Sequence, residues 1–481
     1  MGSCILSFNC YIYTTIMLST LLSSASAFTK RHTSVAVVRS RLSNRLSSTT
    51  ASEGVDQVIV VGGGIAGLAT AAALQNIANV PKIQVLEKSS HDSFFQKEGI
   101  GAGVQLGPNG LRALRAIGGE ELMQRVIDSG SILKGNAIYL PGMSDPMMQP
   151  DTTEEDSGLP QVFVRWSVLR SNLNDLLAPA VDIQFNAGSD ICGYEVAGDG
   201  SLNILSESGA AIASTPPASA PTSLIVGADG AVSKCRYWIQ TGQSDIPATE
   251  REKVDTFDLV DTGRINLKAV VPKSLGDSFE EGHTYSYFAP GGGVACFAGP
   301  AGDGHTYWAI SIADEKDEET GQVIQFMANK GQSDLNEVKL ALLDKISSLD
   351  TDTVKFASDM IEATDPETIY ATRSKEAQNI GPSLATNDGK VVLVGDAAHA
   401  MSGAYGQNPN FALEGAAELA TCIRNNGSIE SALQKYSSMR VGRCFEMQKR
   451  SAERAAKAMK GGKDLEDVSA WIHKWDIEKN E

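Results

Sequence analysis

The chain has 481 residues, a length that accommodates two packed domains. Its hydrophobic content of 42% and charged content of 21% are ordinary for a globular protein, whereas 58 acidic residues against 41 basic ones leave a net charge of −17. A surplus of negative charge opposes binding to phosphate backbones and to anionic lipid surfaces. We therefore expect no nucleic-acid partner.

The first 52 residues differ in composition from the rest, because no Asp or Glu precedes Glu53. Residues 1–27 have an apolar centre and end in Ala-Ser-Ala, which is typical of a signal peptide. Residues 28–52 are rich in Ser and Arg, as in a transit peptide. This order, with Phe28 after the cleavage site, resembles the bipartite plastid presequence of algae such as diatoms. We therefore expect a plastid protein, with secretion or an endomembrane location as the alternative.

Five cysteines remain after the presequence, and they show no C-x-x-C spacing. Their odd number predicts scattered buried thiols rather than a disulfide framework, and their spacing predicts no metal site. After residue 53 the chain has no run of 18 uninterrupted apolar residues. We therefore expect no membrane span, while peripheral association with a membrane stays open.

The mature chain opens with a strand, a glycine turn and a helix. Residues 56–78 give an apolar run, three glycines and an Ala/Leu-rich stretch of helical spacing, and residues 82–89 form a second strand. Residues 222–230 and 389–400 each show a short apolar strand that is ended by Asp-Gly or Gly-Asp. These patterns predict parallel strands whose carboxyl ends meet at one ligand crevice.

Segments of another kind lie between these strands. Residues 263–272, 283–299 and 305–313 carry apolar and aromatic runs separated by turns, which predict a mixed or antiparallel sheet. We expect a nucleotide-binding domain at 53–132, 161–250 and 385–442, a second domain at 133–160 and 251–384, and a helical tail at 443–481 with a break at Gly461-Gly462. Residues 141–158 and 208–223 are predicted to be surface loops.

Gly62, Gly64 and Gly67 form a G-x-G-x-x-G pattern between the first strand and the first helix. The first glycine permits a tight turn, the second lets a pyrophosphate approach the backbone, and the third allows close packing of helix on strand. Glu87 follows Gly67 by 20 residues at the end of the next strand, where a carboxylate binds a ribose 2′-hydroxyl and repels a 2′-phosphate. The pattern indicates FAD or NAD rather than NADP.

Four further segments carry a family resemblance: residues 98–118 (EGIGAGVQLGPNGLRALRAIG), 163–177 (FVRWSVLRSNLNDLL), 224–236 (LIVGADGAVSKCR) and 391–401 (VVLVGDAAHAM). They resemble motifs of the FAD-dependent group A flavoprotein monooxygenases, in particular the salicylate hydroxylase and 3-hydroxybenzoate 6-hydroxylase branch and the related zeaxanthin epoxidases. The resemblance covers about residues 56 to 440. It implies the α/β fold of p-hydroxybenzoate hydroxylase, with a Rossmann-like FAD-binding domain and an inserted substrate domain. It also implies FAD as cofactor and NADPH or NADH as transient co-substrate.

The resemblance also assigns roles to particular residues. Asp396 would bind the ribityl or ribose region of the flavin, Arg165 would lie beside the cofactor, and Asp229 would lie where FAD and the pyridine nucleotide meet. An aspartate after a strand also commonly caps a helix, and an arginine such as Arg165 is often a surface charge. The cofactor-binding residues so predicted are Gly62, Gly64, Ile65, Ala66, Gly67, Glu87, Lys88, Gly103, Arg165, Asp229, Asp396, Gly406, Gln407, Asn408 and Asn410.

The loop before the helix expected to begin near Gly406-Gln407 departs from the family pattern. The family usually has proline at Gly403, glycine at Asn408, a small residue at Pro409 and aspartate at Gly415. Pro409 suits the first turn of a helix but removes one N–H donor. We expect Asn408 to preserve the backbone shape, because asparagine tolerates a positive φ better than most residues. Flavin binding is expected to survive these changes.

No catalytic base can be assigned from the sequence. His283, His305 and Lys268 lie on predicted strands of the second domain, and any of them could face the substrate. His399 is as well explained by a structural role as by a functional one. The aromatic residues of these strands are more typical of a core than of a substrate wall; they are Tyr285, Phe288, Phe297, Tyr307 and Trp308.

The resemblance implies a monooxygenase in which reduced flavin and oxygen form a C4a-hydroperoxide, which delivers one oxygen atom to an electron-rich ring or double bond. The expected substrate is a small aromatic or quinone-like molecule, consumed together with O2 and NAD(P)H. Three alternatives stay open: a xanthophyll epoxidase acting on a carotenoid, a flavin reductase or dehydrogenase, and a flavin-binding protein that has lost turnover because of its altered loop.

Overall fold

The computed structural model describes residues 54–95, 102–140, 145–217, 222–254, 256–273, 280–313, 334–349, 354–459 and 469–479. The predicted presequence and the expected Gly461-Gly462 break lie outside these residues. The five cysteines after residue 53 are buried free thiols, as predicted. Among the helices described, each is too short or too polar to cross a membrane.

The predicted β–turn–α–β opening is present. β1 (Gln57–Val61) runs parallel to β2 (Lys82–Glu87), and α1 (Ile65–Asn76) connects them. Their sheet has five strands, all parallel, in the order β18-β12-β1-β2-β8. Its other strands are β8 (Asp182–Phe185), β12 (Ser223–Gly227) and β18 (Val391–Leu393). All five carboxyl ends therefore lie along one edge of this sheet.

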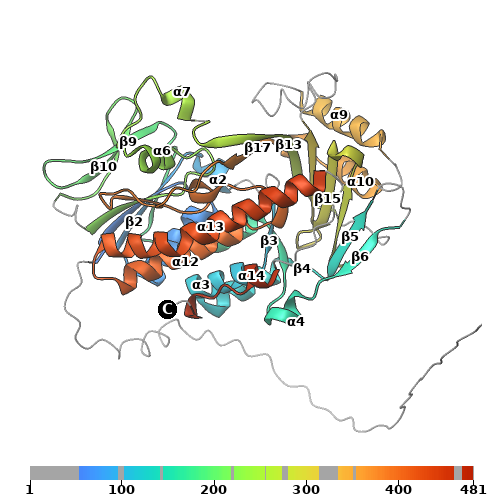
Figure 1. Cartoon of the computed structure of the whole chain (residues 1–481), viewed down its shortest axis with the longest axis horizontal. Helices are drawn as coiled ribbons and strands as arrows, with labels where there is room; N and C mark the ends of the chain where they lie inside the picture. Colours follow the sequence, from blue (N-terminus) through green and yellow to red (C-terminus); the bar gives the residue numbers. More distant parts are fainter. Residues whose placement is uncertain are drawn as a thin grey trace, which may run out of the picture. The chain divides into compact units, whose positions relative to one another are not determined.

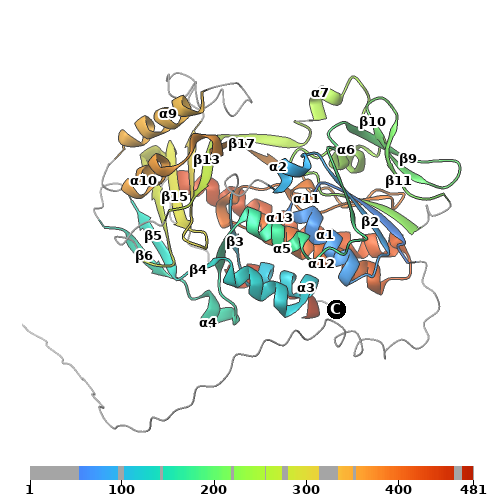
Figure 2. The ribbon, with the colours of Figure 1, turned by 180° about the vertical axis from the view of Figure 1, so that it is seen from behind.

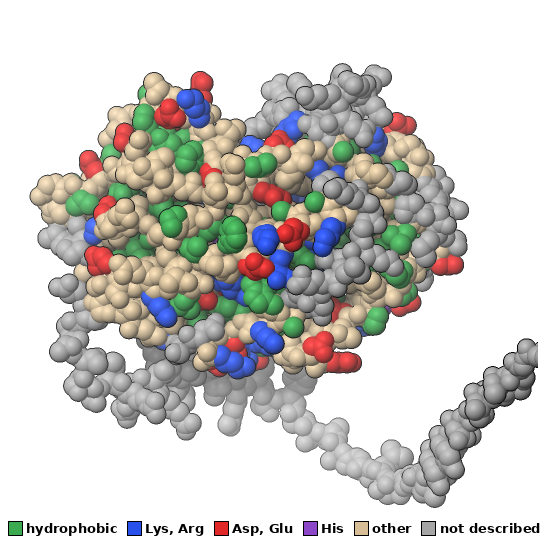
Figure 3. Space-filling model, in the orientation of Figure 1, with side chains coloured by type: hydrophobic (Ala, Val, Ile, Leu, Met, Phe, Trp, Pro, Cys, Tyr) green, Lys and Arg blue, Asp and Glu red, His purple; other side chains and the backbone are tan. Residues whose placement is uncertain are grey.

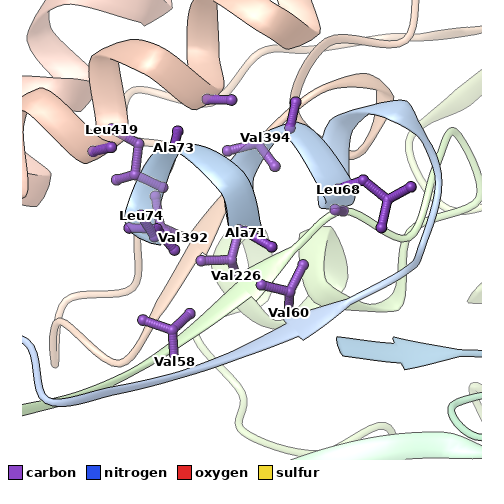
Figure 4. Close-up of a cluster of buried hydrophobic side chains, with 14 of the residues drawn as sticks. Val58, Val60, Leu68, Ala71, Ala73, Leu74, Val226, Val392, Val394 and Leu419 are labelled. Atoms are coloured by element: carbon purple, nitrogen blue, oxygen red, sulfur yellow. The ribbon is translucent and has the colours of Figure 1, made fainter. Parts of the chain in front are cut away.

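The core of this region lies between the parallel sheet and two helices, α1 and α12 (Asn408–Asn425). Figure 4 shows Leu68 and Leu74 of α1 pointing into the same cluster as strand valines and Leu419 of α12. These leucines are fully buried. Because α1 buries residues on every side, it is apolar around its whole circumference and rich in alanine. Truncating one of these leucines to alanine typically costs about 2–5 kcal/mol.

A seven-stranded mixed sheet forms from the segments predicted for a second sheet. β5 pairs parallel with β14, and the other neighbours are antiparallel. Ile265, Leu267 and Ala269 point from one face into a core covered by α9 (Leu335–Ser347) and α10 (Lys355–Ala363). In sheet order the strands are β17 (Tyr370–Ala377), β13 (Leu259–Val271), β16 (Thr306–Ala313), β15 (Val294–Pro300), β14 (His283–Phe288), β5 (Gly135–Tyr139) and β6 (Met147–Pro150).

Two small antiparallel sheets complete the strands. One joins β3 (Gly103–Leu106), β7 (Val162–Arg165) and β4 (Ser131–Ile132); the other joins β9 (Ile191–Val196), β10 (Leu202–Ser206) and β11 (Ala211–Ser214). The two segments predicted to be surface loops are therefore partly regular, which corrects that prediction. β11 lies in one of them, and β6 and α4 (Thr153–Ser157) lie in the other. Their many Gly, Pro and Ser residues concealed short exposed strands held by backbone pairing.

A long helix, α13 (Ile429–Met459), contacts both α12 and the 3₁₀ turn η3 (Pro290–Gly292) of the mixed sheet (Figures 1 and 2). It passes through residue 443 without a break, so the tail boundary predicted there is not a structural boundary. Arg440 and Arg443 share one face of this helix and both donate to the carboxylate of Glu414. The charged residues near 443 therefore belong to the middle of the helix and do not indicate its end. Further along the chain, α14 (Ser469–His473) and η6 (Ile477–Lys479) contact α3 (Pro108–Asp128).

The remaining helices are α2 (His91–Phe95), α3 (Pro108–Asp128), α5 (Trp166–Asn174), α6 (Lys234–Thr241), α7 (Arg251–Val254), α11 (Asp396–His399), η4 (Pro366–Thr368) and η5 (Gly403–Tyr405). Acidic and basic side chains are interspersed over the face of the molecule in Figure 3. That face has no broad patch of basic side chains among the described residues, a distribution unlike that of a nucleic-acid-binding surface.

Candidate active site

The glycine turn after β1 has the geometry expected of a dinucleotide-binding turn. Gly62 has a φ of +107°, and a Cβ there would lie 2.4 Å from the carbonyl oxygen of Ala228. A Cβ on Gly67 would lie 1.8 Å from the Gly62 carbonyl oxygen, so helix and turn pack in direct contact. Gly64 differs, because nothing lies within 4 Å of its Cβ position, and no side chain caps α1 there. The N-terminus of α1 thus offers free N–H groups to an anion.

Glu87 lies beside this turn, at the end of β2. Its carboxylate accepts hydrogen bonds from the backbone N–H of Gly63 (2.8 Å) and of Ser89 (2.7 Å), and its side chain is buried. Lys88, also predicted to bind the cofactor, is exposed, whereas Ile65 and Ala66 lie in the first turn of α1. Glu87 is therefore held where a ribose next to the pyrophosphate would meet a carboxylate.

Asp229 follows β12 and caps α6. Its carboxylate accepts hydrogen bonds from Ser233 Oγ (2.5 Å) and from the backbone N–H groups of Lys234 (2.8 Å) and Cys235 (3.1 Å). Burial raises the pKa of Asp229, and these hydrogen bonds oppose the rise. Asp229 thus accepts from the first turn of α6, whose N-cap residue is Ser233, and it lies at the carboxyl edge of the parallel sheet.

Arg236, which the sequence argument did not single out, links the segments after β12 and β18. Its guanidinium donates to the carbonyl oxygens of Asp396 (3.3 Å) and Ala397 (3.1 Å) and also to that of Ala231. Its side chain is buried and lies 4.0 Å from the carboxylate of Asp258. Arg236 is the last residue of the 224–236 motif, and this position is the sequence feature from which its role could have been predicted.

Asp396 begins α11 directly after β18. The preceding Gly395 has a φ of +60°, and a Cβ there would lie 2.5 Å from the side chain of Ala66, so α11 packs on the glycine turn. The Asp396 carboxylate accepts a hydrogen bond from Asn408 Nδ2 (3.3 Å). Burial raises the pKa of Asp396, whereas Asn408 and the positive charges of Lys268 and Arg236 lower it.

The loop before α12, whose sequence departs from the family pattern, partly differs in structure from what we expected. α12 begins at Asn408, after Gln407 as its N-cap residue, slightly later than predicted. The positive φ, +63°, occurs at Gly406, so Asn408 does not replace a glycine by adopting that conformation. Instead the Asn408 amide donates to Asp396 and to the carbonyl oxygen of Met401 (3.0 Å). Pro409 lies in the first helical turn, as predicted.

Two predicted cofactor-binding side chains in this loop are occupied by protein. Asn410 is fully buried; it accepts from the Gly107 N–H (2.9 Å) and donates to the carbonyl oxygen of Gln105 (2.9 Å). Gln407 accepts from Asn109 Nδ2 (3.0 Å). Their side chains anchor the loop to the start of α3, which leaves only their backbone groups to face a ligand.

Arg165 and Gly103 lie where the β3-β7-β4 sheet meets the seven-stranded sheet. Arg165 donates to Asp303 (2.5 Å), and its Nη1 lies 3.4 Å from Nε2 of His305. A Cβ on Gly103 would collide with the rings of Phe163 and Tyr307. In this structure both residues therefore join the two sheets, and Arg165 has a carboxylate partner.

The three candidate bases have different surroundings. His283 stands at the start of β14, beside Glu280 (3.6 Å), and His305 lies next to Arg165. Lys268 lies on the face of β13 opposite the core and interacts electrostatically with Asp396. The structure thus brings only Lys268 of the three into electrostatic range of the loop after β18.

His399 is buried, and the aromatic residues of the second domain divide between the two faces of the seven-stranded sheet. Burial lowers the pKa of His399 to about 3, so the imidazole is neutral near pH 7 and is unsuited to donate a proton. Tyr285 and Trp308 are core residues, as predicted. Phe297 and Tyr307 lie on the other face of the sheet, where their rings contact Phe163 with centroids 5.9 and 5.4 Å away.

Comparison with known proteins agrees with this geometry. The FAD binding domain family matches residues 220–451. The aurachin C monooxygenase/isomerase of Stigmatella aurantiaca is 25% identical over 388 residues, which cover 80% of this chain and 85% of that protein. The 3-amino-4-hydroxybenzoate 2-monooxygenase of Streptomyces cremeus is 25% identical over 404 residues, 82% and 86% of the two chains.

Solved structures share the fold. The crystal structure of Klebsiella pneumoniae HpxO with FAD and uric acid superposes with a TM-score of 0.64 at 19% identity, over 88% of this chain and 94% of that one. A tetrameric 2-methyl-3-hydroxypyridine-5-carboxylic acid oxygenase superposes with a TM-score of 0.62 at 21% identity, over 88% and 97%. Both confirm the predicted p-hydroxybenzoate hydroxylase-like fold.

Motifs, fold and relatives together define an oxidoreductase that uses FAD. The matched FAD binding domain and the similarity to these monooxygenases support a group A flavoprotein monooxygenase of the aromatic-hydroxylase type. The residues present fit FAD, because the open position at Gly64 and the uncapped end of α1 accommodate a pyrophosphate, and Glu87 lies next to them.

Proposed function

We propose that the protein is an NAD(P)H-consuming monooxygenase that hydroxylates a small aromatic or quinone-like molecule. The observation that carries this proposal is the electrostatic interaction between Lys268 of the seven-stranded sheet and Asp396 at the carboxyl edge of the parallel sheet. Lys268 lies on the face of β13 opposite the core under α9 and α10, so the charge on that face interacts with the segment after β18 that is predicted to bind the flavin. A flat ring bound on that face would lie next to a flavin held by Gly64, Glu87 and Asp396.

The protein's own groups supply placement and electrostatics. Bound flavin supplies the redox and oxygen chemistry, so few side chains are needed for it. The N-terminus of α12 carries no side-chain cap, and its N–H groups and dipole stabilise negative charge that develops nearby. Pro409 removes one of these donors. The rings of Phe163, Phe297 and Tyr307 fill the junction between the sheets and exclude water from that side.

The test is NAD(P)H oxidation by the purified, FAD-loaded chain, with and without hydroxybenzoates, quinols and xanthophylls. Strong stimulation by one compound, with formation of its hydroxylated product, supports the proposal and identifies the substrate class. Epoxide formation from a xanthophyll would instead establish the epoxidase alternative. Hydrogen peroxide production that no compound changes would support a flavin reductase, and a yellow protein without turnover would support loss of activity.

A further inference from the structure

Lys268 has surroundings that set it apart from the other cations near the candidate site. On β13 it pairs with Tyr370 of β17 and with Ala309 of β16, and Ala309 pairs with Phe297 of β15. Residues paired directly across a sheet share a face. Lys268 therefore stands in a row of aromatic and small side chains, on the face of the sheet opposite the core under α9 and α10.

The ammonium group of Lys268 contacts an aromatic ring and has no charged partner in an ion pair among the described residues. It lies over the ring of Tyr370, 5.5 Å from the centroid, and it makes no hydrogen bond or ion pair with the residues that the structure describes. Asp396 attracts it, but the Asp396 carboxylate already accepts from Asn408 and lies near Arg236. A half-buried, unpaired ammonium is energetically unfavourable unless a ligand brings the compensating charge.

Neighbouring cations are already engaged. Arg165 is paired with Asp303. Arg264 lies on the same face of β13, four residues before Lys268 and hence about 13 Å away along the strand. Its guanidinium donates to Ser311 Oγ, to the Ser311 carbonyl and to the Gly292 carbonyl, each at 2.8 Å. Of these three cations, Lys268 is the one that makes no hydrogen bond or ion pair with the described residues.

We propose that Lys268 is the substrate-recognition residue of this protein and that its ammonium group binds a negatively charged oxygen on an aromatic substrate, either a carboxylate or a phenolate. This inference rests on the proposed function and narrows it to anionic rings. The protein's net charge of −17 repels anions at long range, so the local positive charge is needed to hold one. The aromatic rings beside Ala309 bind the flat body of the ligand, and Lys268 orients it.

The test measures ligand binding through the absorption spectrum of the oxidised flavin, which requires no turnover. The probes are 3-hydroxybenzoate, 3-hydroxybenzamide, which lacks the carboxylate, and 3-methoxybenzoate, which cannot form a phenolate. The proteins are wild type, Lys268→Met, Lys268→Arg and the control Lys273→Met, which removes an exposed lysine just beyond β13. Flavin content and thermal melting show that each variant is folded.

We expect Lys268→Met to weaken binding of the anionic probes roughly 10- to 100-fold, the effect of losing one hydrogen bond to a charged group. Lys268→Arg should retain most of the affinity, and Lys273→Met should behave as wild type. A loss shared by both benzoates identifies the carboxylate, whereas a loss confined to probes with a free hydroxyl, growing with pH, identifies the phenolate.

Equal affinity of Lys268→Met and wild type for every anion would overturn the inference, as would an equal loss in Lys273→Met. A wild-type protein that binds none of the anions but hydroxylates a neutral quinol would also overturn it while leaving the proposed function intact. Conversely, anion binding that depends on Lys268 in a protein without turnover would contradict the proposed function alone.

Discussion

Replacing Glu414 with glutamine should destabilise the protein more than any other isosteric change on α12. Glu414 is fully buried, and its carboxylate accepts hydrogen bonds from Arg440 (2.6 Å), from two nitrogens of Arg443 (2.7 and 2.8 Å) and from Asn109 (2.7 Å). Asn109 in turn donates to Gln407, the N-cap residue of α12. The carboxylate therefore neutralises two arginines and also supports the loop that faces the flavin.

The magnitude follows from the charge left behind. Glutamine keeps the size of the side chain but leaves two guanidinium groups with one buried carboxylate, Glu418, 3.4 Å from Arg440. Breaking a buried ion pair by removing one partner costs about 3–5 kcal/mol. With an unfolding entropy of about 2.1 cal/mol/K per residue over roughly 430 residues, this corresponds to a fall in Tm of about 3–6 °C.

The assay is thermal melting of Glu414→Gln beside Glu418→Gln as the matched control. Glu418 is also buried and one turn further along α12, but its bonds are to Trp475 (2.6 Å) and, more distantly, to Arg440. Burial raises the pKa of Glu418, whereas the two arginines lower that of Glu414, so the environment stabilises the charge of Glu418 less than that of Glu414. We expect the control to lose less Tm than Glu414→Gln, because Glu418 makes only an ion pair and no hydrogen bond with Arg440, and a glutamine oxygen can still accept from Trp475.

The pH dependence gives a second, independent readout. Burial alone would raise the pKa of Glu414, but Arg443 and Arg440 outweigh it and lower the pKa to about 2. A carboxyl group with a lowered pKa stabilises the folded state above its unfolded pKa and loses that contribution as pH falls through the folded value. The Tm gap between wild type and Glu414→Gln should be constant from pH 8 to pH 5 and should narrow below about pH 4.5. Equal Tm losses in both variants, or a gap that widens in acid, would refute the reasoning.

Three further outcomes are expected. Gly67→Ala should give little folded, flavin-loaded protein, because its Cβ would lie 1.8 Å from a backbone oxygen. Gly64→Ala meets nothing within 4 Å, so it should fold with wild-type Tm but bind FAD at least roughly tenfold more weakly. Normal FAD affinity in Gly64→Ala would contradict a role of Gly64 in binding the pyrophosphate. Pro409→Ala should raise the yield of product per NAD(P)H, measured by peroxide and product assays, because it restores an N–H in the first turn of α12. Asn408→Gly should lower FAD affinity, measured by flavin titration, because Asp396 loses its hydrogen-bond donor. An unchanged product yield per NAD(P)H in Pro409→Ala would exclude an effect of the missing N–H. A fluorescent protein fused behind residues 1–52 should enter the plastid of a diatom, and secretion of the fusion would reject our localisation proposal.

The parallel sheet and the glycine turn could be predicted from the sequence because their causes are local. A continuous apolar run followed by closely spaced glycines specifies a buried strand and a turn whatever the rest of the chain does. Gly67 is required because its Cβ would collide with the carbonyl oxygen of nearby Gly62, and Gly62 is required because its Cβ would collide with that of Ala228, just after the adjacent strand β12. The carboxylates after β2, β12 and β18 follow from the same pattern, since parallel strands share one edge.

The features that escaped prediction depend on contacts between segments far apart in the chain. Arg236 reaches Asp396, and Asn410 reaches Gly107, across 160 and 303 residues. No local pattern distinguishes an amide that faces a ligand from one that ties two segments together. The side-chain orientation of Lys268 was likewise open, because alternation along β13 shows two faces but not which one is covered by α9 and α10.

The altered loop illustrates how one departure from a family pattern can be compensated by another. Asn408 supplies the donor that holds Asp396, and Asn410 and Gln407 tie the loop to α3. Gly415 removes the side chain that would crowd the Tyr436 hydroxyl, 3.2 Å from its Cβ position, and Tyr436 donates to the Leu393 carbonyl at the end of β18. In this protein, side chains therefore hold in place a loop that glycine would leave more flexible. The departures from the family pattern thus favour a rigid flavin-binding loop over the loss of flavin binding.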